Sequence, residues 1–369
     1  MNSVTCPAFP REGRIAACLQ EPSLGANLSI QPVAACPAPA PASGEDVLSV
    51  LARLLAADIE ACNRTIVARM DSPVALIPQL AAHIVAAGGK RLRPLLTLAC
   101  ARLCGYREGA RHIKLAACVE FIHTATLLHD DVVDESQLRR GLASANAVFG
   151  NKASVLVGDF LFARAFQLMV EDGSLKVLEI LSRAAATIAE GEVLQLVTQN
   201  DLSTDYARYL DVIKGKTAAL FEAGCQVGAI VAEKPEAEAA LAAYGMSLGI
   251  AFQLVDDALD YSADQATLGK TVGDDFREGK MTLPVLLALD AADAEERAFW
   301  ERTIEQLDQT EADLDRALTL IDRHDATRRT LDRARGFAEA AKEALAVFPD
   351  SELRDCLRDI ADYTVARIR

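Results

Sequence analysis

Apolar residues recur at three- and four-residue spacing along almost the whole chain from residue 46 onward. This period places them on one face of a helix, so the pattern predicts helices. Alternating apolar and polar runs bounded by turn residues, which are typical of strands, are missing. The predicted helices cover residues 46–70, 75–87, 94–104, 110–130, 151–170, 174–199, 206–231 and 236–262, with shorter ones between 281 and 368.

Two of these segments, 110–130 and 241–261, are apolar on most sides. Helices of this kind belong in the centre of a bundle, so we expect one large all-α domain over residues 46–369. Two stretches interrupt the helical pattern. Gly88-Gly89 predicts a turn, and the charged, glycine-bearing segment 263–280 is expected to form a lid.

Residues 1–45 differ from the rest of the chain. They are rich in Pro, Ala and Ser and show no amphipathic period, which predicts a disordered tail. The tail has few acidic residues and two arginines, so a transit peptide stays open as an alternative.

Charge and cysteine content narrow the class of protein. The chain has 369 residues and a formal net charge of −15, whereas affinity for nucleic acid comes mainly from Lys and Arg on phosphates. We therefore expect no nucleic-acid partner. Charged residues break the apolar runs before the ~18 residues of a membrane span, which predicts no transmembrane segment. Nine cysteines without a CxxC pair or a secretory signal predict a cytoplasmic protein.

The strongest chemical signal is a DDxxD motif that occurs twice, at residues 130–134 and 256–260, each time at the end of an apolar helix. Residues i and i+4 lie on one helical face, so Asp130 pairs with Asp134 and Asp256 pairs with Asp260. Like charges at this spacing repel, and the C-terminal end of the helix dipole disfavours them further. A cation must compensate. An oxygen-only donor set suits Mg²⁺, which bridges one or two carboxylates to substrate phosphates.

The second signal is cationic. The turn GGKRLRP at residues 88–94 places three cations in four positions before a helix, where free backbone N–H groups favour an anion. Further cations follow the first acid motif, begin the predicted helix at Lys214, and lie in the predicted lid. Together with two metal-carboxylate sites, this pattern favours a protein that binds two diphosphate groups.

These motifs resemble those of the trans-isoprenyl diphosphate synthases, the polyprenyl synthetase family. The resemblance covers roughly residues 80–290 and is carried, in order, by GGKRLRP, FIHTATLLHDDVVDES, RRG, GDFLFARAF, GKTA, FQLVDDALDY and GDDFREGKMTLP. The first aspartate region and AEGEVLQL (189–196) are most similar to long-chain members such as octaprenyl diphosphate synthases. The resemblance implies a helical bundle with a central cavity, a homodimer, and Mg²⁺ as cofactor.

The resemblance also implies roles for individual residues. Asp130, Asp134 and Asp256 are expected to hold Mg²⁺ on the allylic diphosphate, with Asp131, Asp257 and Asp260 as supporting ligands. Isopentenyl diphosphate is expected on Lys90, Arg93, His123 and Arg140. The allylic diphosphate and the developing carbocation are assigned to Arg139, Lys216, Thr217 and Gln253, with Lys216 counted as catalytic. Lys270 and Lys280 are expected to close over the phosphates and exclude water.

Product length follows from a steric argument. Ala125 and Thr126, five and four residues before Asp130, are small, so we expect an open tunnel and a long product. The resemblance to long-chain members implies that this product serves a quinone side chain. Phe166 and Met169 are the candidate floor of that tunnel. Release of such a product implies transient contact with a membrane.

Alternatives remain at this point. A shorter-chain (geranylgeranyl) synthase keeps the same chemistry, and a non-catalytic subunit of a heteromeric synthase keeps the fold. A class I terpene cyclase has no need of the cations around Lys90, and a phosphohydrolase or a di-iron bundle needs histidine ligands at spacings that this chain lacks.

Overall fold

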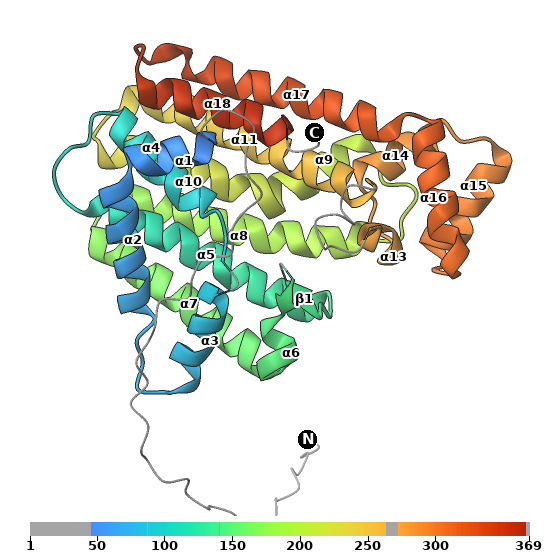
Figure 1. Cartoon of the computed structure of the whole chain (residues 1–369), viewed down its shortest axis with the longest axis horizontal. Helices are drawn as coiled ribbons and strands as arrows, with labels where there is room; N and C mark the ends of the chain where they lie inside the picture. Colours follow the sequence, from blue (N-terminus) through green and yellow to red (C-terminus); the bar gives the residue numbers. More distant parts are fainter. Residues whose placement is uncertain (1–45, 87, 140, 263–271, 367–369) are drawn as a thin grey trace, which may run out of the picture. The chain divides into compact units, whose positions relative to one another are not determined.

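Helices make up nearly all of the structure, a computed structural model that describes residues 46–86, 88–139, 141–262 and 272–366 (Figure 1). The predicted all-α fold is confirmed. The α-helices are α1 (Val47–Leu54), α2 (Ala56–Arg69), α3 (Leu76–Ala86), α4 (Leu92–Leu103), α5 (Arg111–Val133), α6 (Ala145–Phe149), α7 (Asn151–Asp172), α8 (Leu175–Thr198), α9 (Tyr206–Ile213), α10 (Ala219–Val231), α11 (Pro235–Asp260), α13 (Asp274–Arg277), α14 (Leu283–Asp290), α15 (Ala294–Trp300), α16 (Glu311–Arg323), α17 (Ala326–Ala344) and α18 (Glu352–Ala366). The other elements are strands β1 (Leu138–Arg139) and β2 (Leu142–Ala143), π-helices η1 (Lys214–Ala218) and η2 (Glu301–Glu305), and 3₁₀-helix η3 (Leu345–Val347). From Gly44 the chain forms one compact unit, and the predicted tail lies outside the described residues.

The structure differs from the sequence prediction in three places. The segment 46–70 divides into α1 and α2 at Leu55. The residues from Lys214 do not begin a helix, because η1 joins α9 to α10 without a break. A two-stranded antiparallel hairpin, β1–β2, follows α5, and each of its strands has only two residues. Strands this short carry too few residues for an alternating pattern to be visible in the sequence.

Helix α10 lies in the interior of the bundle, where it packs against α4, α8 and α11. Glycines allow the backbones to approach closely. A Cβ atom on Gly245 of α11 would lie 2.5 Å from the carbonyl oxygen of Phe221 in α10. A Cβ atom on Gly228 of α10 would lie 2.7 Å from the Cβ atom of Cys100 in α4. These contacts hold α4, α10 and α11 together as one packed unit.

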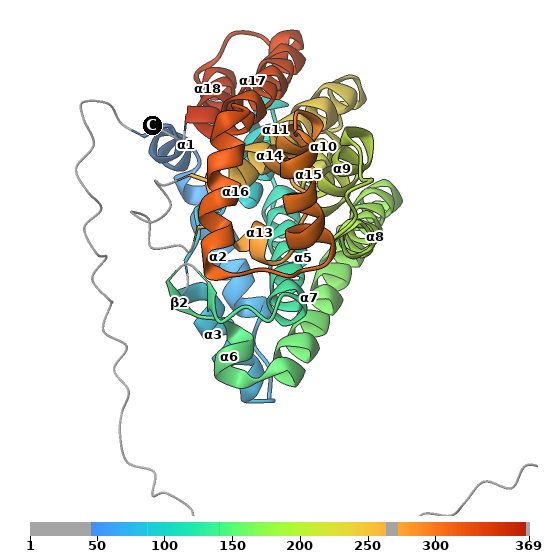
Figure 2. The same ribbon diagram turned by 90° about the vertical axis from the view of Figure 1, so that its right-hand side faces the viewer.

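The long helices form layers that Figures 1 and 2 show from two sides. Helices α17 and α18 lie along one edge, α7 lies toward the opposite edge, and α5 packs against α7. A second, smaller core lies among α13–α17 and surrounds Trp300. Phe276 of α13 is 1% exposed and packs against Phe299 and Trp300, which anchors the segment that follows residue 272.

Two helices, α7 and α11, are long and apolar enough to cross a membrane by length and composition alone. The sequence analysis expected none. In this fold 44% of the α7 window and 50% of the α11 window are buried, and both helices pack along others in the bundle. Their apolar character is that of helices in the core of the fold.

We predict that Gly245→Ala destabilises the protein by about 1–3 kcal/mol, because the added methyl group overpacks the contact with α10. Chemical unfolding monitored by circular dichroism measures the change. Gly336→Ala in α17 is the matched control, since nothing lies within 4 Å of its added Cβ atom. That variant should gain stability by about 0.5–1 kcal/mol from helix propensity. Equal behaviour of the two variants would contradict the close packing of α11 on α10.

Candidate active site

The two aspartate motifs occupy the C-terminal ends of α5 and α11, as predicted. Within each motif the residues divide into two groups. Asp131 and Asp257 are 2% and 4% exposed and turn into the protein. Asp130, Asp134, Asp256 and Asp260 retain partial exposure. Each motif therefore offers its i and i+4 carboxylates to a common space, and its second aspartate to the interior.

Asp131 is bound by Arg139 of β1. The Arg139 guanidinium donates to both carboxylate oxygens of Asp131, at 2.6 Å from Nη2 to Oδ1 and 2.9 Å from Nε to each oxygen. Asn146 donates to the Asp131 carbonyl oxygen at 3.0 Å. Arg139 therefore pairs with a protein carboxylate in this structure, and both oxygens of Asp131 accept from it. The predicted roles of Arg139 at the diphosphate and of Asp131 as a supporting ligand stay predictions.

Asp257 is the equivalent buried residue of the second motif. Its Oδ2 accepts a hydrogen bond from the Tyr209 hydroxyl of α9, and its Oδ1 accepts one from Gln253 Nε2 at 2.7 Å. The Gln253 oxygen in turn accepts from the Thr217 hydroxyl of η1, also at 2.7 Å. The predicted pair Thr217 and Gln253 is therefore in contact, but Asp257 has both oxygens engaged inside the protein and is not placed as a metal ligand. Tyr209 was missed by the sequence analysis.

Lys216 extends from η1 toward the first aspartate motif. Its Nζ lies 2.8 Å from Glu192 Oε2 of α8. Burial lowers the pKa of Lys216, but Asp130 and Glu192 outweigh it, so that pKa is raised. The π-helical turn fits because Gly191 and Gly215 meet: a Cβ atom on Gly191 would lie 2.5 Å from the Lys216 backbone nitrogen. Glu192 lies within the AEGEVLQL stretch, where residue type alone does not mark it as part of the site.

The segment 273–280 connects the two motifs. The Gly273 N–H donates to the Asp260 carbonyl oxygen at 2.8 Å, and the Asp275 N–H donates to Asp260 Oδ2 at 3.0 Å. Lys280 Nζ lies 3.7 Å from Asp134 Oδ2 and 3.9 Å from Asp275 Oδ1. The ends of α5 and α11 therefore meet at one site, with Lys280 between them. Closure of Lys280 over the phosphates stays a prediction.

Carboxylates outnumber cations at this site, and burial changes their acidity. Burial raises the pKa of Asp130 and of Asp257 to about 7. Burial raises the pKa of Asp260 to about 6, and that of Asp275 to about 8 with a further contribution from Asp260. Asp275 lies in the quoted GDD motif, but the sequence analysis assigned it no role. A site whose acids resist ionisation needs a further cation to bring them to full charge.

The donor set fits Mg²⁺ in part. All of the available donors are carboxylate oxygens, the ligands that this ion prefers. Among the described residues, no three acid, histidine or cysteine side chains converge closely enough to hold a metal ion by themselves. This arrangement suits an ion that takes one or two protein carboxylates and completes its coordination with water and substrate phosphate.

The predicted isopentenyl diphosphate residues are only partly brought together. Arg93 of α4 and His123 of α5 are neighbours, with Nη1 and Nε2 3.1 Å apart, and the Arg93 guanidinium stacks on Phe221 at 4.4 Å. Lys90 does not join this pair. Its ammonium group contacts the hydroxyl and the ring of Tyr363 in α18. Two other predicted residues, Arg140 and Lys270, lie outside the described residues.

The product-length residues also divide. Ala125 is fully buried, while Thr126 is half-buried and donates to the His123 carbonyl oxygen at 2.8 Å. Met169 of α7 is 1% exposed, whereas Phe166 on the same helix is 43% exposed. Their role as the floor of a tunnel stays a prediction. The sequence pattern gives the residue type at each position, but it does not show which apolar side chains of a core helix face outward.

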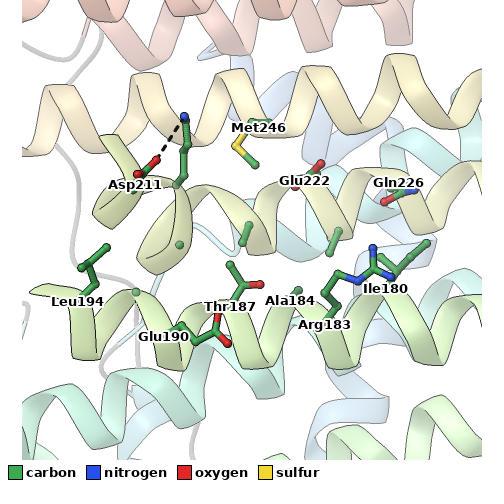
Figure 3. A pocket seen from close by; sticks show the side chains of 15 residues that line it. Ile180, Arg183, Ala184, Thr187, Glu190, Leu194, Asp211, Glu222, Gln226 and Met246 are labelled. Carbon is green, nitrogen blue, oxygen red and sulfur yellow. Dashed lines mark ion pairs between the residues drawn. The ribbon is translucent and has the colours of Figure 1, made fainter. Parts of the chain in front are cut away.

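A separate cavity of about 340 Å³ lies between α8, η1 and α10 (Figure 3). Figure 3 shows Thr187 and Glu190 of α8 facing Glu222 and Gln226 of α10 across it. Lys214 and Gly215 line this cavity, whereas Lys216 reaches Glu192 beside the aspartates. None of the predicted site residues lines the cavity, so η1 separates it from the candidate active site.

Residues 74–321 match the family model for polyprenyl synthetase. The chain belongs to the polyprenyl synthetase family. It is 48% identical over 326 residues to the octaprenyl diphosphate synthase of Haemophilus influenzae. The matched region covers 88% of this chain and 98% of that protein. As a family member the protein is a prenyltransferase, and dependence on Mg²⁺ is typical of the family.

Solved structures agree with this family. A decaprenyl diphosphate synthase from Rhodobacter capsulatus has a TM-score of 0.84 at 55% identity and covers 87% of this chain and 99% of its own. A polyprenyl synthase from Caulobacter crescentus, complexed with calcium and isoprenyl diphosphate, also has a TM-score of 0.84 at 55% identity and covers 89% of this chain and 100% of its own. Family membership removes the phosphohydrolase and di-iron alternatives.

We predict that the metal-free synthase loses stability as pH rises from about 4 to about 8. The raised pKa values mean that the folded state holds protons that the unfolded state has released, so raising the pH favours unfolding. Thermal unfolding in EDTA should give a lower Tm at pH 8 than at pH 6, and Mg²⁺ should reduce the difference.

Asp275→Asn is the control for this pH dependence. It should raise the Tm in EDTA at pH 8 but change it little at pH 5, where the native carboxyl is already neutral. Burial lowers the pKa of His112, so the contribution of His112 to stability rises with pH. Comparing the wild type with Asp275→Asn cancels this contribution and leaves the effect of the Asp275 carboxyl group. A higher Tm for the wild type than for Asp275→Asn at pH 8 would contradict the assignment.

Proposed function

We propose that the protein is a long-chain trans-polyprenyl diphosphate synthase, which condenses isopentenyl diphosphate onto an allylic diphosphate such as farnesyl diphosphate. The observation that carries this proposal is the meeting of two aspartate motifs at one site, with Lys216 and Lys280 beside them. The octaprenyl and decaprenyl names of relatives at 48% and 55% identity favour an octaprenyl to decaprenyl product for a quinone side chain.

Four half-buried carboxylates are proposed to hold Mg²⁺ together with the allylic diphosphate: Asp130, Asp134, Asp256 and Asp260. When bound, Mg²⁺ supplies Lewis-acid stabilisation of the negative charge that develops on the departing diphosphate. Asp131 and Asp257 support the motifs from inside, because Arg139 and Tyr209 keep their carboxylates turned away. More than one ion per site follows from the presence of two such motifs.

The chain's own cations act on the diphosphates. Lys216 and Lys280 carry ammonium groups whose pKa values are raised by the surrounding carboxylates, so both are charged and donate to anionic oxygens. Arg93 and His123 are neighbours on α4 and α5 and are proposed to bind the diphosphate of isopentenyl diphosphate. Fixed charges of this kind stabilise a leaving group without reorganisation during the reaction.

Two alternatives are less well supported. A non-catalytic subunit should lack part of the site, but both acid motifs and the cationic turn are intact. A shorter-chain synthase should carry bulky side chains before the first motif, where Ala125 and Thr126 are small. A cytoplasmic location and release of the product at a membrane remain proposals.

We predict that the purified protein incorporates labelled isopentenyl diphosphate into farnesyl diphosphate in the presence of Mg²⁺. Chromatographic sizing of the product should show chains far longer than C20. EDTA should abolish incorporation. Absence of incorporation would overturn the synthase proposal, and a C20 product would overturn the long-chain proposal.

Chain length is tested in the same assay by bulky substitutions. Thr126→Phe should shorten the product, because residue 126 lies on the face of α5 that carries Asp130. Ala125→Phe tests the second position, with the Tm measured alongside because Ala125 is fully buried. If folded Thr126→Phe and Ala125→Phe proteins both make the wild-type product, the tunnel does not pass these residues.

We also propose that the protein is a homodimer that buries the outer face of α7. Three large apolar residues lie exposed at helical spacing on this face: Val155 at 39%, Phe166 at 43% and Val170 at 66%. Neighbouring α8 adds Val193 and Val197, both 59% exposed. Exposed large apolar side chains on neighbouring helices favour an interface, and a second copy supplies the same apolar chemistry.

We predict that Phe166→Glu weakens this dimer, because a charge then has to be buried in an apolar interface. Analytical ultracentrifugation should show a lighter species for the variant than for the wild type. Val347→Glu is the control, since Val347 is 70% exposed in η3, away from α7. A wild type that sediments as a monomer would refute the dimer.

A further inference from the structure

A continuous chain of hydrogen bonds joins three elements beneath the second aspartate motif. The Tyr209 hydroxyl of α9 donates to Asp257 Oδ2, and Gln253 Nε2 donates to Asp257 Oδ1 at 2.7 Å. The Thr217 hydroxyl of η1 donates to Gln253 Oε1 at 2.7 Å. Every donor and acceptor in this chain has one partner that suits it, so the direction of each bond follows from the side-chain types.

Three of the four members of this chain are buried, and Gln253 is half-buried. Tyr209, Asp257 and Thr217 are 3%, 4% and 6% exposed. A buried donor or acceptor that loses its partner incurs its full desolvation penalty, so each member constrains the next. Rotation of the Asp257 carboxylate would leave Gln253 without an acceptor, and rotation of Gln253 would change the partner of Thr217.

Tyr209 is itself held rigidly. Asp205 caps the start of α9 by accepting a hydrogen bond from the Arg208 N–H at 2.8 Å. The Tyr209 ring stacks on Tyr206, whose other neighbour is the Arg333 guanidinium of α17 at 4.3 Å. The hydroxyl that meets Asp257 therefore comes from a ring with little freedom to move.

We propose that Tyr209 is a positioning residue that keeps Asp257 turned inward and thereby fixes the two flanking carboxylates, Asp256 and Asp260, and the Gln253–Thr217 pair toward the diphosphate site. This inference rests on the proposed function. Tyr209 acts through Asp257 and touches no reacting atom. Its effect should fall on binding of the metal and the allylic diphosphate, while the Arg93–His123 pair on α4 and α5 stays unchanged.

Tyr209→Phe tests this role because it removes only the hydroxyl group. We expect kcat/KM for farnesyl diphosphate to fall about 10- to 100-fold and the Mg²⁺ concentration for half-maximal activity to rise, as is typical when a partner of a metal-binding motif is lost. The KM for isopentenyl diphosphate should stay within about twofold. A merely structural role would lower the Tm without separating the two substrates.

Tyr206→Phe is the matched control. It removes the same atom from the same helix, and the Tyr206 hydroxyl makes no hydrogen bond within the part of the chain that the structure describes. Its kinetic constants should match those of the wild type. Equal effects of Tyr209→Phe and Tyr206→Phe on Mg²⁺ dependence would overturn the proposal.

Two further measurements keep the test decisive. In a double-mutant cycle, adding Tyr209→Phe to Asp257→Asn should cause no further loss, and multiplicative losses would overturn action through Asp257. Calorimetric binding of inorganic pyrophosphate with Mg²⁺ needs no turnover, and Tyr209→Phe should weaken it while Tyr206→Phe should not. An inactive wild type would refute the synthase proposal but would leave the role of Tyr209 open. The pyrophosphate titration tests the role of Tyr209 without turnover.

Discussion

The structure depends on one electrostatic constraint, the gathering of carboxylates at the ends of α5 and α11. Two helix C-termini disfavour negative charge, and burial raises the pKa values of Asp130, Asp260 and Asp275. Lys216 and Lys280 offset part of this repulsion, because each contacts or faces acids from more than one element. Carboxylates still outnumber cations at this site, which favours binding of a further cation.

Close backbone packing places those lysines. Gly191 and Gly215 meet so tightly that neither has room for a side chain, and this contact seats the π-helical turn η1 against α8. The turn directs Lys216 to Glu192 and Thr217 to Gln253, on one side, and lines the cavity of Figure 3 on the other. The two glycines therefore set the distance between α8 and η1, and this distance places Lys216 and Thr217 at the active site.

Much of this was accessible from the sequence. Helical period located nearly every helix. Of the residues that the sequence singled out, the structure brings Thr217 to Gln253 and Lys280 to Asp134. The i, i+4 spacing set the second aspartate of each motif apart from the other two, but it could not show where that side chain points. Which one turns inward depends on Arg139 and Tyr209, and Tyr209 lies about fifty residues away from its acceptor, Asp257.

By itself the sequence determined the fold class and the chemistry, because period and residue type are local properties that need no knowledge of distant contacts. Only the tertiary structure decided that Arg139 binds Asp131, that Lys90 meets Tyr363, and that Phe166 faces outward. Those outcomes depend on which helices lie side by side and how they are rotated about their axes. Rotation is set by the packing of the whole bundle, so a motif specifies which groups are present but not the direction in which each one points.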